Sequence, residues 1–276
     1  MFKARDRRDV ERAIVKIHRF FKKQRFHPRG HVYLDRVVLA HISKALSLSQ
    51  SILCLVEAGF PEEAFGLSRT LVEIALNLRF ITNRYSERRA QRFVHYFARW
   101  KMELIRRTLK HFHSLDDQGH KIPTYTKTQI RKMMTDYKQM VKIARKYPNR
   151  TSWTETRNRK ASKGGVWMMA TEPDKYEIVQ GVPIKWEFDY DWIYFWTSQY
   201  VHATVLSMDS HAVAPREAFA VRIAPERGQQ MAKLAVFNVT VYLLKILVMA
   251  FRAIGHELPQ HLANPLWNLL KRMARK

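Results

Sequence analysis

The chain has 276 residues, of which 46% are hydrophobic, and 49 Lys and Arg against 24 Asp and Glu give it a formal net charge of +25. This apolar content is sufficient for a sizeable core and excludes a disordered basic tail. A single cysteine, Cys54, excludes a framework of intrachain disulfides and fits a reducing compartment, so we expect a cytoplasmic protein. Because Cys54 lies in an apolar run, we expect it to be packed as a small hydrophobe.

Apolar residues recur at helical spacing along most of the chain, and Pro, Gly and Asp interrupt the pattern between segments. The stretch 234–251 comes nearest to a membrane span, but it contains Asn238, Thr240 and Lys245. We therefore expect a buried core helix there and no transmembrane segment. In chain order, helices are predicted over residues 9–26, 32–57, 61–82, 86–115, 127–147, 190–211, 225–254 and 260–275.

Residues 148–188 break this pattern, because they contain several Pro and Gly residues and show no helical period. Short alternating pieces at 176–179 and 184–186 are consistent with a small hairpin. The sequence therefore predicts an all-α fold, a multi-helix bundle of about eight helices. It forms a single helical domain over residues 1–276 with one irregular basic and aromatic insert at about 148–188.

A polar stripe runs along the otherwise apolar helix predicted at 61–82. Arg69, Glu73 and Asn77 are spaced by four residues and so share one side of the helix. A buried charge without a partner is prohibitive, so these groups must pair with one another or with a polar stripe on another helix.

The helix predicted at 190–211 offers such a stripe, because Tyr194, Ser198 and His202 are also spaced by four residues. If the two stripes meet, one interpretation is a catalytic or ligand site in which His202 acts as acid or base, Arg69 holds an anion and Glu73 orients one of them. The other interpretation is a buried ion-pair network that fixes the register of the helices. Both interpretations remain open at this point.

Two short motifs resemble those of an uncharacterised bacterial family known only as a domain of unknown function, the DUF5677 type. The motifs are the helical segment Ser68–Glu73 and, over a hundred residues later, Ser198–His202. The family pattern is an Arg-Ser-Leu-Leu-Glu-like helix followed by a Tyr/Ser…Val-His helix, and the resemblance covers about residues 35–212. It implies an all-helical fold and one site containing Arg69, Glu73 and His202, and it implies no reaction.

The positive charge is concentrated in two stretches. Residues 84–163 hold 22 bases and 6 acids, and residues 1–29 hold 11 bases and 3 acids. A field of one sign costs stability but attracts polyanions, so we expect a nucleic acid partner, with RNA favoured, bound mainly through phosphate contacts. Aromatic residues lie among these Lys and Arg residues, a combination that is typical of proteins that bind single-stranded nucleic acid. The candidate contacts are Arg106, Arg107, His111, Arg145, Lys146, Trp153, Arg157, Arg159, Lys160 and Lys163.

Two alternatives stay open. The first is a metal-independent ribonuclease centred on His202 or on Arg106 and His111, in which His acts on the ribose 2′-hydroxyl and Arg holds the phosphate. The second is a protein of anionic membrane surfaces or a scaffold. No zinc-ligand spacing or nucleotide-binding glycine motif is present, so we expect no metal or cofactor. We hypothesise a bacterial antiphage defence, toxin or mobile-element setting, with a second protein of that system as a partner and self-association left open.

Overall fold

The structure is a computed structural model, and its fold is all-α, as predicted. It describes residues 4–23, 31–84, 86–117, 127–145, 169–170, 172, 178–179, 182–183, 186–187, 189–194, 197, 212–213, 220–221 and 228–275. The chain divides into two compact units. The single domain with one insert at about 148–188 stays a prediction, and most of that insert lies outside the described residues. The first unit combines residues 1–86 with 166–276, and the second comprises residues 87–165. We describe each unit separately.

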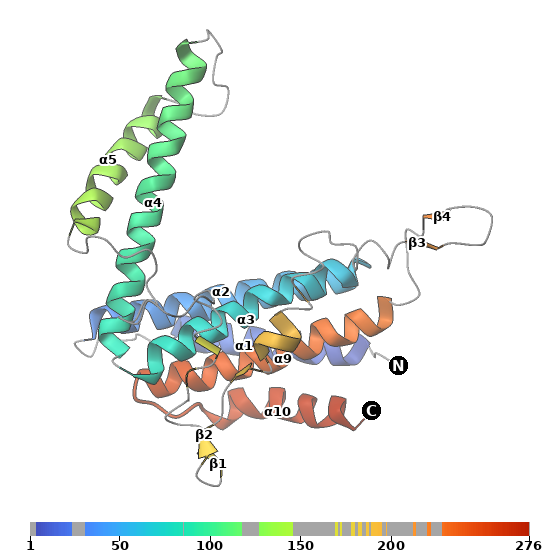
Figure 1. Ribbon diagram of the computed structural model, residues 1–276. Coiled ribbons are helices and arrows are strands. Elements are labelled where there is room, and N and C mark those ends of the chain that lie inside the picture. The colour runs from blue at the N-terminus through green and yellow to red at the C-terminus, as the bar shows by residue number, and fades with distance from the viewer. Residues whose placement is uncertain are drawn as a thin grey trace. The chain divides into compact units, whose positions relative to one another are not determined.

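The first unit is a helical bundle in which α3 packs most extensively against α9, and α2 lies beside both (Figure 1). The helices α1 and α10 pack against each other, and both also contact α9. Within the described residues the bounds agree with the predicted helices except that α1 begins earlier, and the predicted end at 26 and the predicted start at 225 lie outside the described residues. The observed bounds are α1 (Ala4–Lys23), α2 (Val32–Glu57), α3 (Pro61–Asn83), α9 (Gly228–Ala253) and α10 (Gln260–Ala274).

Glycine ends two of these helices. Gly59 follows α2 with φ of 86°, and Gly255 follows α9 with φ of 71°. In this left-handed conformation the backbone turns back, so that the amide of Phe60 donates to the carbonyl of Leu55 at 2.8 Å. Pro61 then starts α3, where its fixed φ suits the first helical turn. The helix breakers in the sequence therefore coincide with the observed helix ends.

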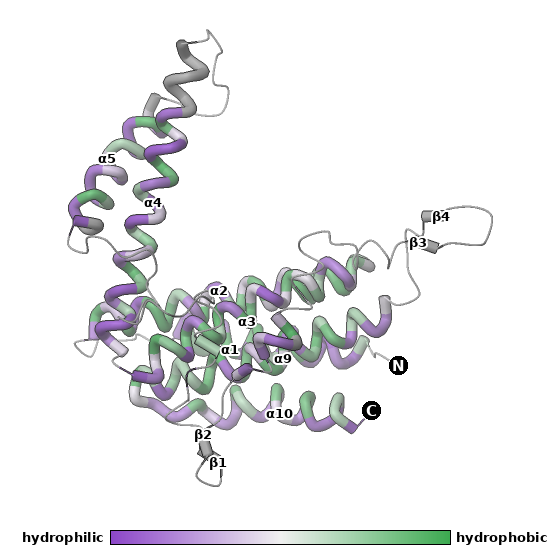
Figure 2. The backbone as a smooth tube through the Cα atoms, viewed as in Figure 1, coloured by the Kyte–Doolittle hydropathy of each residue, from purple (hydrophilic) through white to green (hydrophobic). Residues whose placement is uncertain are grey.

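The core of the first unit is formed mainly by α2, α3 and α9, whose hydrophobic residues are shown in Figure 2. By length and composition alone, α2 and α9 could each cross a membrane. More than half of each apolar segment is nevertheless buried within the bundle, and core helices of globular proteins have the same length and composition. The stretch 234–251 accordingly packs as a core helix, as its polar residues predicted.

Two local expectations need correction. Cys54 is exposed, although Ile52 and Leu53 next to it are buried. The apolar run lies on one turn of α2, and only one side of that turn faces the core, so Cys54 points outward. In addition, the segment predicted to begin an α-helix at 190 is described as the π-helix η1 (Asp189–Tyr194).

Two short strand pairs accompany the helices. The antiparallel pair of β1 (Ile178–Val179) and β2 (Val182–Pro183) lies inside the predicted insert, slightly before the second expected hairpin strand. A second antiparallel pair joins β3 (Ala212–Val213) and β4 (Ala220–Val221). Each strand has two residues, so the all-α class is unaffected.

The second unit contains α4 (Ser86–Asp117) and α5 (Lys127–Ala144). Lys101 of α4 forms an ion pair with Asp136 of α5, at 3.6 Å between Nζ and Oδ2. Hydrophilic and hydrophobic residues are interspersed along both helices, in contrast to the mainly hydrophobic α9 (Figure 2). The described part of this unit therefore exposes both charged and apolar side chains.

Candidate functional site

A polar cluster joins α3 to η1 in the first unit. Arg69 and Glu73 form an ion pair on one side of α3, with 3.2 Å between Nη2 and Oε1. The same Nη2 donates a hydrogen bond of 2.7 Å to the hydroxyl oxygen of Tyr194. The Arg69 guanidinium carbon lies 4.6 Å from the centre of the Tyr194 ring, within the range of a cation–π interaction. We call these three residues the α3–η1 cluster.

The protonation of Tyr194 follows from its surroundings. Burial raises the pKa of its hydroxyl, the hydrogen bond from Arg69 opposes this, and the Glu73 charge reinforces the rise. The hydroxyl is therefore neutral near pH 7 and can accept from Arg69 while interacting with Glu73. Tyr190 stacks on Tyr194, with ring centres 5.0 Å apart and planes 14° from parallel. Charge is balanced within this cluster, because one cation faces one anion.

The predicted meeting of two polar stripes is thus seen at Arg69, Glu73 and Tyr194. Ser198 and His202, the other two predicted catalytic residues, lie outside the described residues. The structure therefore brings together the Arg–Glu pair and the first residue of the second stripe. A catalytic role for this group, with His202 as acid or base, stays a prediction.

A second polar cluster was not predicted from the sequence. Arg79, on α3, is only 1% exposed. Its Nη1 donates to the carbonyl of Met169 at 2.6 Å, and its Nη2 donates to the carbonyl of Glu172. Its guanidinium also lies 5.2 Å from the centre of the buried Trp186 ring. Arg79 therefore fixes the segment that precedes η1 against α3.

Lys245 of α9 completes this second cluster. Its Nζ lies 2.8 Å from Oδ1 of Asp189 and 4.2 Å from the centre of the Trp186 ring. The hydroxyl of Tyr242 donates to the same Oδ1 at 2.5 Å, and burial, followed by the Asp189 charge, raises the pKa of that hydroxyl well above its usual value. Charged residues inside apolar segments, such as Arg79 and Lys245, were the available sequence signal. The sequence alone did not identify their partners.

A neutral polar link also crosses the core. Asn238 of α9 donates from Nδ2 to the Ser68 hydroxyl at 2.9 Å, and that hydroxyl donates to the carbonyl of Phe65 at 2.6 Å. Both side chains are buried. The link satisfies polar groups that would otherwise destabilise the α3–α9 packing.

The second unit presents the candidate nucleic-acid residues. Arg106 and Arg107 are exposed on α4, and both bind Glu103 at 2.8 Å. These hydrogen bonds, first from Arg106 and then from Arg107, lower the pKa of Glu103 to about 2. The two arginines therefore share one neutralising carboxylate. Exposed bases of the described part of this unit are Arg88, Arg99, Arg106, Arg107, Lys110, Arg131, Lys132, Lys138, Lys142 and Arg145.

The remaining predicted nucleic-acid residues are not placed. The side chain of His111 and the residues Lys146, Trp153, Arg157, Arg159, Lys160 and Lys163 lie outside the described residues. Of the ten predicted residues, Arg106, Arg107 and Arg145 are therefore seen to be exposed.

Large apolar side chains are exposed on α4, and the sequence did not single them out. Phe97 is 55% exposed and Trp100 is 52% exposed, and their rings stack with centres 5.8 Å apart and planes 30° from parallel. Leu104, also exposed, follows at the next helical interval. The signal in the sequence was apolar spacing of three and four residues, which usually indicates a buried face.

Within the described residues, no group of three or more His, Cys, Asp and Glu side chains could hold a metal ion.

Comparison with known proteins identifies the family. A model of a family of unknown function, DUF5677, matches residues 35–218, which include the α3–η1 cluster and α4 and α5. No curated protein and no solved structure matches the chain. The match covers about the extent that the motifs at Ser68–Glu73 and Ser198–His202 suggested, and most of the chain lies within it. The chain therefore belongs to the DUF5677 family.

Proposed function

We propose that the protein binds single-stranded nucleic acid, with RNA favoured, on the surface of α4 and α5. The observation that carries the proposal is the exposed, stacked pair Phe97–Trp100 on a helix rich in exposed Lys and Arg. The nucleobases of a single strand stack on such rings, and Lys and Arg side chains beside the rings contact the phosphates.

The energies favour this combination of groups. Stacking of a base on an aromatic side chain contributes about 1–3 kcal/mol. Exposed Phe and Trp on a protein surface are otherwise unfavourable, because their apolar area remains in water. A strand that stacks on Phe97 and Trp100 would cover this area, while exposed basic residues such as Lys110 and Lys138 supply positive charge.

Charge decides between a nucleic acid and a second copy of the chain on this surface. A second copy would bring another unit with the same strongly positive sequence, residues 84–163, against the first. Like charges at an interface oppose association, whereas a polyanion is attracted. Sequence-specific recognition of RNA mostly targets unpaired bases that stack on aromatic side chains, which supports RNA as the favoured strand. We further propose a cytoplasmic location and a role in bacterial defence.

The test is a salt titration of binding to labelled oligo(U) and oligo(dT), each about 16 nucleotides long, a length within the range of single-strand binding sites. The variant Phe97→Leu/Trp100→Leu should bind about tenfold more weakly or worse, because two stacking rings are lost. The matched control is Phe60→Leu, which removes an exposed aromatic ring of the first unit at the start of α3.

Equal affinities of these two variants, or binding that does not weaken with salt, would contradict the proposal. The same samples should be checked for cleavage of the oligonucleotide. Cleavage that the wild-type protein performs and His202→Ala loses would instead support the metal-independent ribonuclease.

A further inference from the structure

We propose that α1 and α10, in the first unit, form a second polyanion-binding surface, which binds the phosphate backbone of double-stranded nucleic acid. This surface uses residues different from those of α4 and α5. The proposal is therefore independent of the proposed single-strand function, and either can fail alone.

The outer side of α1 is lined by Lys and Arg side chains. One side of the helix is buried against the bundle, through Val10, Ala13, Ile14 and Ile17. The opposite side is solvent-exposed and carries positive charge along its whole length. Within the part of the chain that the structure describes, the following exposed bases of α1 form no ion pair: Arg8, Lys16, Arg19, Lys22 and Lys23.

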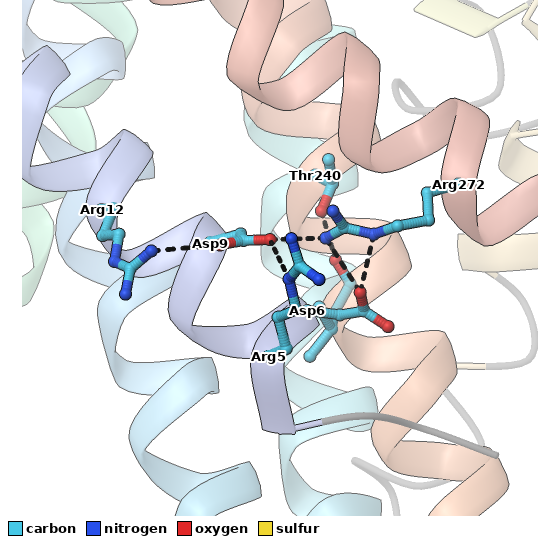
Figure 3. Close-up of polar contacts among 7 residues, drawn as sticks. Arg5, Asp6, Asp9, Arg12, Thr240 and Arg272 are labelled. Carbon is cyan, nitrogen blue, oxygen red and sulfur yellow. Dashed lines mark hydrogen bonds and ion pairs between the residues drawn. The ribbon is translucent and has the colours of Figure 1, made fainter.

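The Asp and Glu side chains of α1 form ion pairs with other arginines and so do not neutralise these Lys and Arg residues. Asp6 and Asp9 both bind Arg272 of α10, with Nη2 at 2.9 Å from Asp6 and 2.5 Å from Asp9 (Figure 3). Glu11 binds Arg7 at 2.6 Å. The helix α10 contains no Asp or Glu.

The same ion pairs hold the two helices together. Asp6 is buried, and Arg272 reaches it from the last turn of α10. Lys271 and Arg275 are exposed beside Arg272. They therefore extend the basic surface from α1 onto its neighbour. Because Arg272 joins the two helices through these ion pairs, the exposed Lys and Arg residues of α1 and α10 belong to one packed helix pair.

The length and composition of this surface favour a duplex. A helix of 20 residues, such as α1, is about 30 Å long, which is close to one turn of a nucleic acid duplex, about 34 Å. A single strand stacks on several rings, whereas the large exposed apolar side chains in the described residues of α1 and α10 are Val15 and one aromatic ring, Trp267. Contacts to phosphates alone suit a duplex, whose bases are paired and stacked.

The distribution of apolar residues disfavours a membrane surface. A helix that lies in the membrane interface buries its apolar face among the lipids. The apolar faces of α1 and α10 are instead buried in the bundle, through residues such as Ile17 and Leu266. Among the described residues of these two helices, Val15 and Trp267 are the only large apolar side chains that are exposed.

The experiment measures binding of the full chain to blunt duplexes of about 20 base pairs, one of RNA and one of DNA, over a range of salt concentrations. The variant Lys16→Gln/Arg19→Gln removes two positively charged side chains from the proposed surface. Its control, Arg36→Gln/Lys44→Gln, removes one Arg and one Lys that are exposed on α2. We expect the magnitude of the negative slope of log K against log salt to fall by about 1.8 in the first variant and to remain unchanged in the control.

Equal slopes for the two variants would overturn the proposal. So would binding of the wild-type protein to phosphatidylserine vesicles that depends on Lys16 and Arg19 in the absence of duplex binding. Phe97→Leu/Trp100→Leu should bind the duplexes like the wild type, and this result separates the present proposal from the single-strand function. A duplex affinity that depends on Phe97 and Trp100 but not on Lys16 and Arg19 would assign duplex binding to α4 and would contradict the proposal.

Discussion

Arg69 donates a hydrogen bond of 2.7 Å to the hydroxyl of Tyr194, a residue 125 positions later in the chain. The whole second unit, residues 87–165, lies between them in the sequence. The bond therefore ties α3, which precedes the second unit, to η1, which follows it. Because both side chains are partly buried, the bond is less screened by water than a surface contact.

This bond predicts a coupling that can be measured. Tyr194→Phe should lower the free energy of unfolding by about 1–2 kcal/mol, since a charged donor loses its acceptor. Urea unfolding of Tyr194→Phe, Arg69→Met and the double variant gives a double-mutant cycle. We expect a coupling energy of about 1 kcal/mol. Strictly additive effects would show that the observed hydrogen bond contributes nothing to stability.

Arg79 should be among the least replaceable residues of the first unit. Arg79→Met keeps much of the apolar volume but removes the donors to the carbonyls of Met169 and Glu172. Hydrogen bonds from charged donors contribute about 1.5–3 kcal/mol each, so we expect a loss of about 3 kcal/mol or more in urea unfolding. Arg84→Met, at the exposed end of α3, is the control and should change stability by less than about 0.5 kcal/mol. Similar losses in both variants would argue against a special role for Arg79.

His41 should make stability depend on pH. Burial lowers its pKa below the usual value of 6.5, opposed by the hydrogen bond with the Val37 carbonyl. The unfolded chain therefore takes up the proton first, and stability falls as pH drops below about 6.5, by at most about 1.4 kcal/mol per pH unit.

Urea unfolding of His41→Gln at pH 7.5 and pH 5.5 tests this effect. The variant should lose less stability on acidification than the wild type, whereas His18→Gln, which replaces an exposed histidine of α1, should behave like the wild type. An unchanged pH dependence in His41→Gln would show that His41 is not the responsible group.

Glu103 should restrain the binding of nucleic acid. It occupies both Arg106 and Arg107, and its pKa of about 2 keeps it charged at neutral pH. Glu103→Gln should therefore strengthen binding to oligo(U) and increase the magnitude of the negative salt slope by about 0.7 for each additional phosphate that the released arginines bind. The control is Glu63→Gln, which removes an exposed acid from α3 and gives the same change in net charge. An equal increase in affinity in both variants would indicate a general charge effect.

Much of the fold could be predicted from the sequence, because helix ends depend on residues that are close in the chain. Gly59 and Pro61 separate α2 from α3, and the observed bounds of both helices agree closely with the expected ones. The polar stripe of Arg69 and Glu73 followed from helical spacing, a property of local geometry. The concentration of bases in residues 84–163 is likewise a property of the sequence.

Only the tertiary structure decided which of these groups meet. Arg272 binds Asp6, 266 positions away, and Lys245 binds Asp189, and no local rule links either pair. The outward direction of Cys54 and the exposure of Phe97 and Trp100 depend on which side of each helix packs against a neighbour. Helical periodicity determines which residues share a side, but long-range packing determines whether that side is buried, and it therefore determines which charged and aromatic groups can meet a ligand.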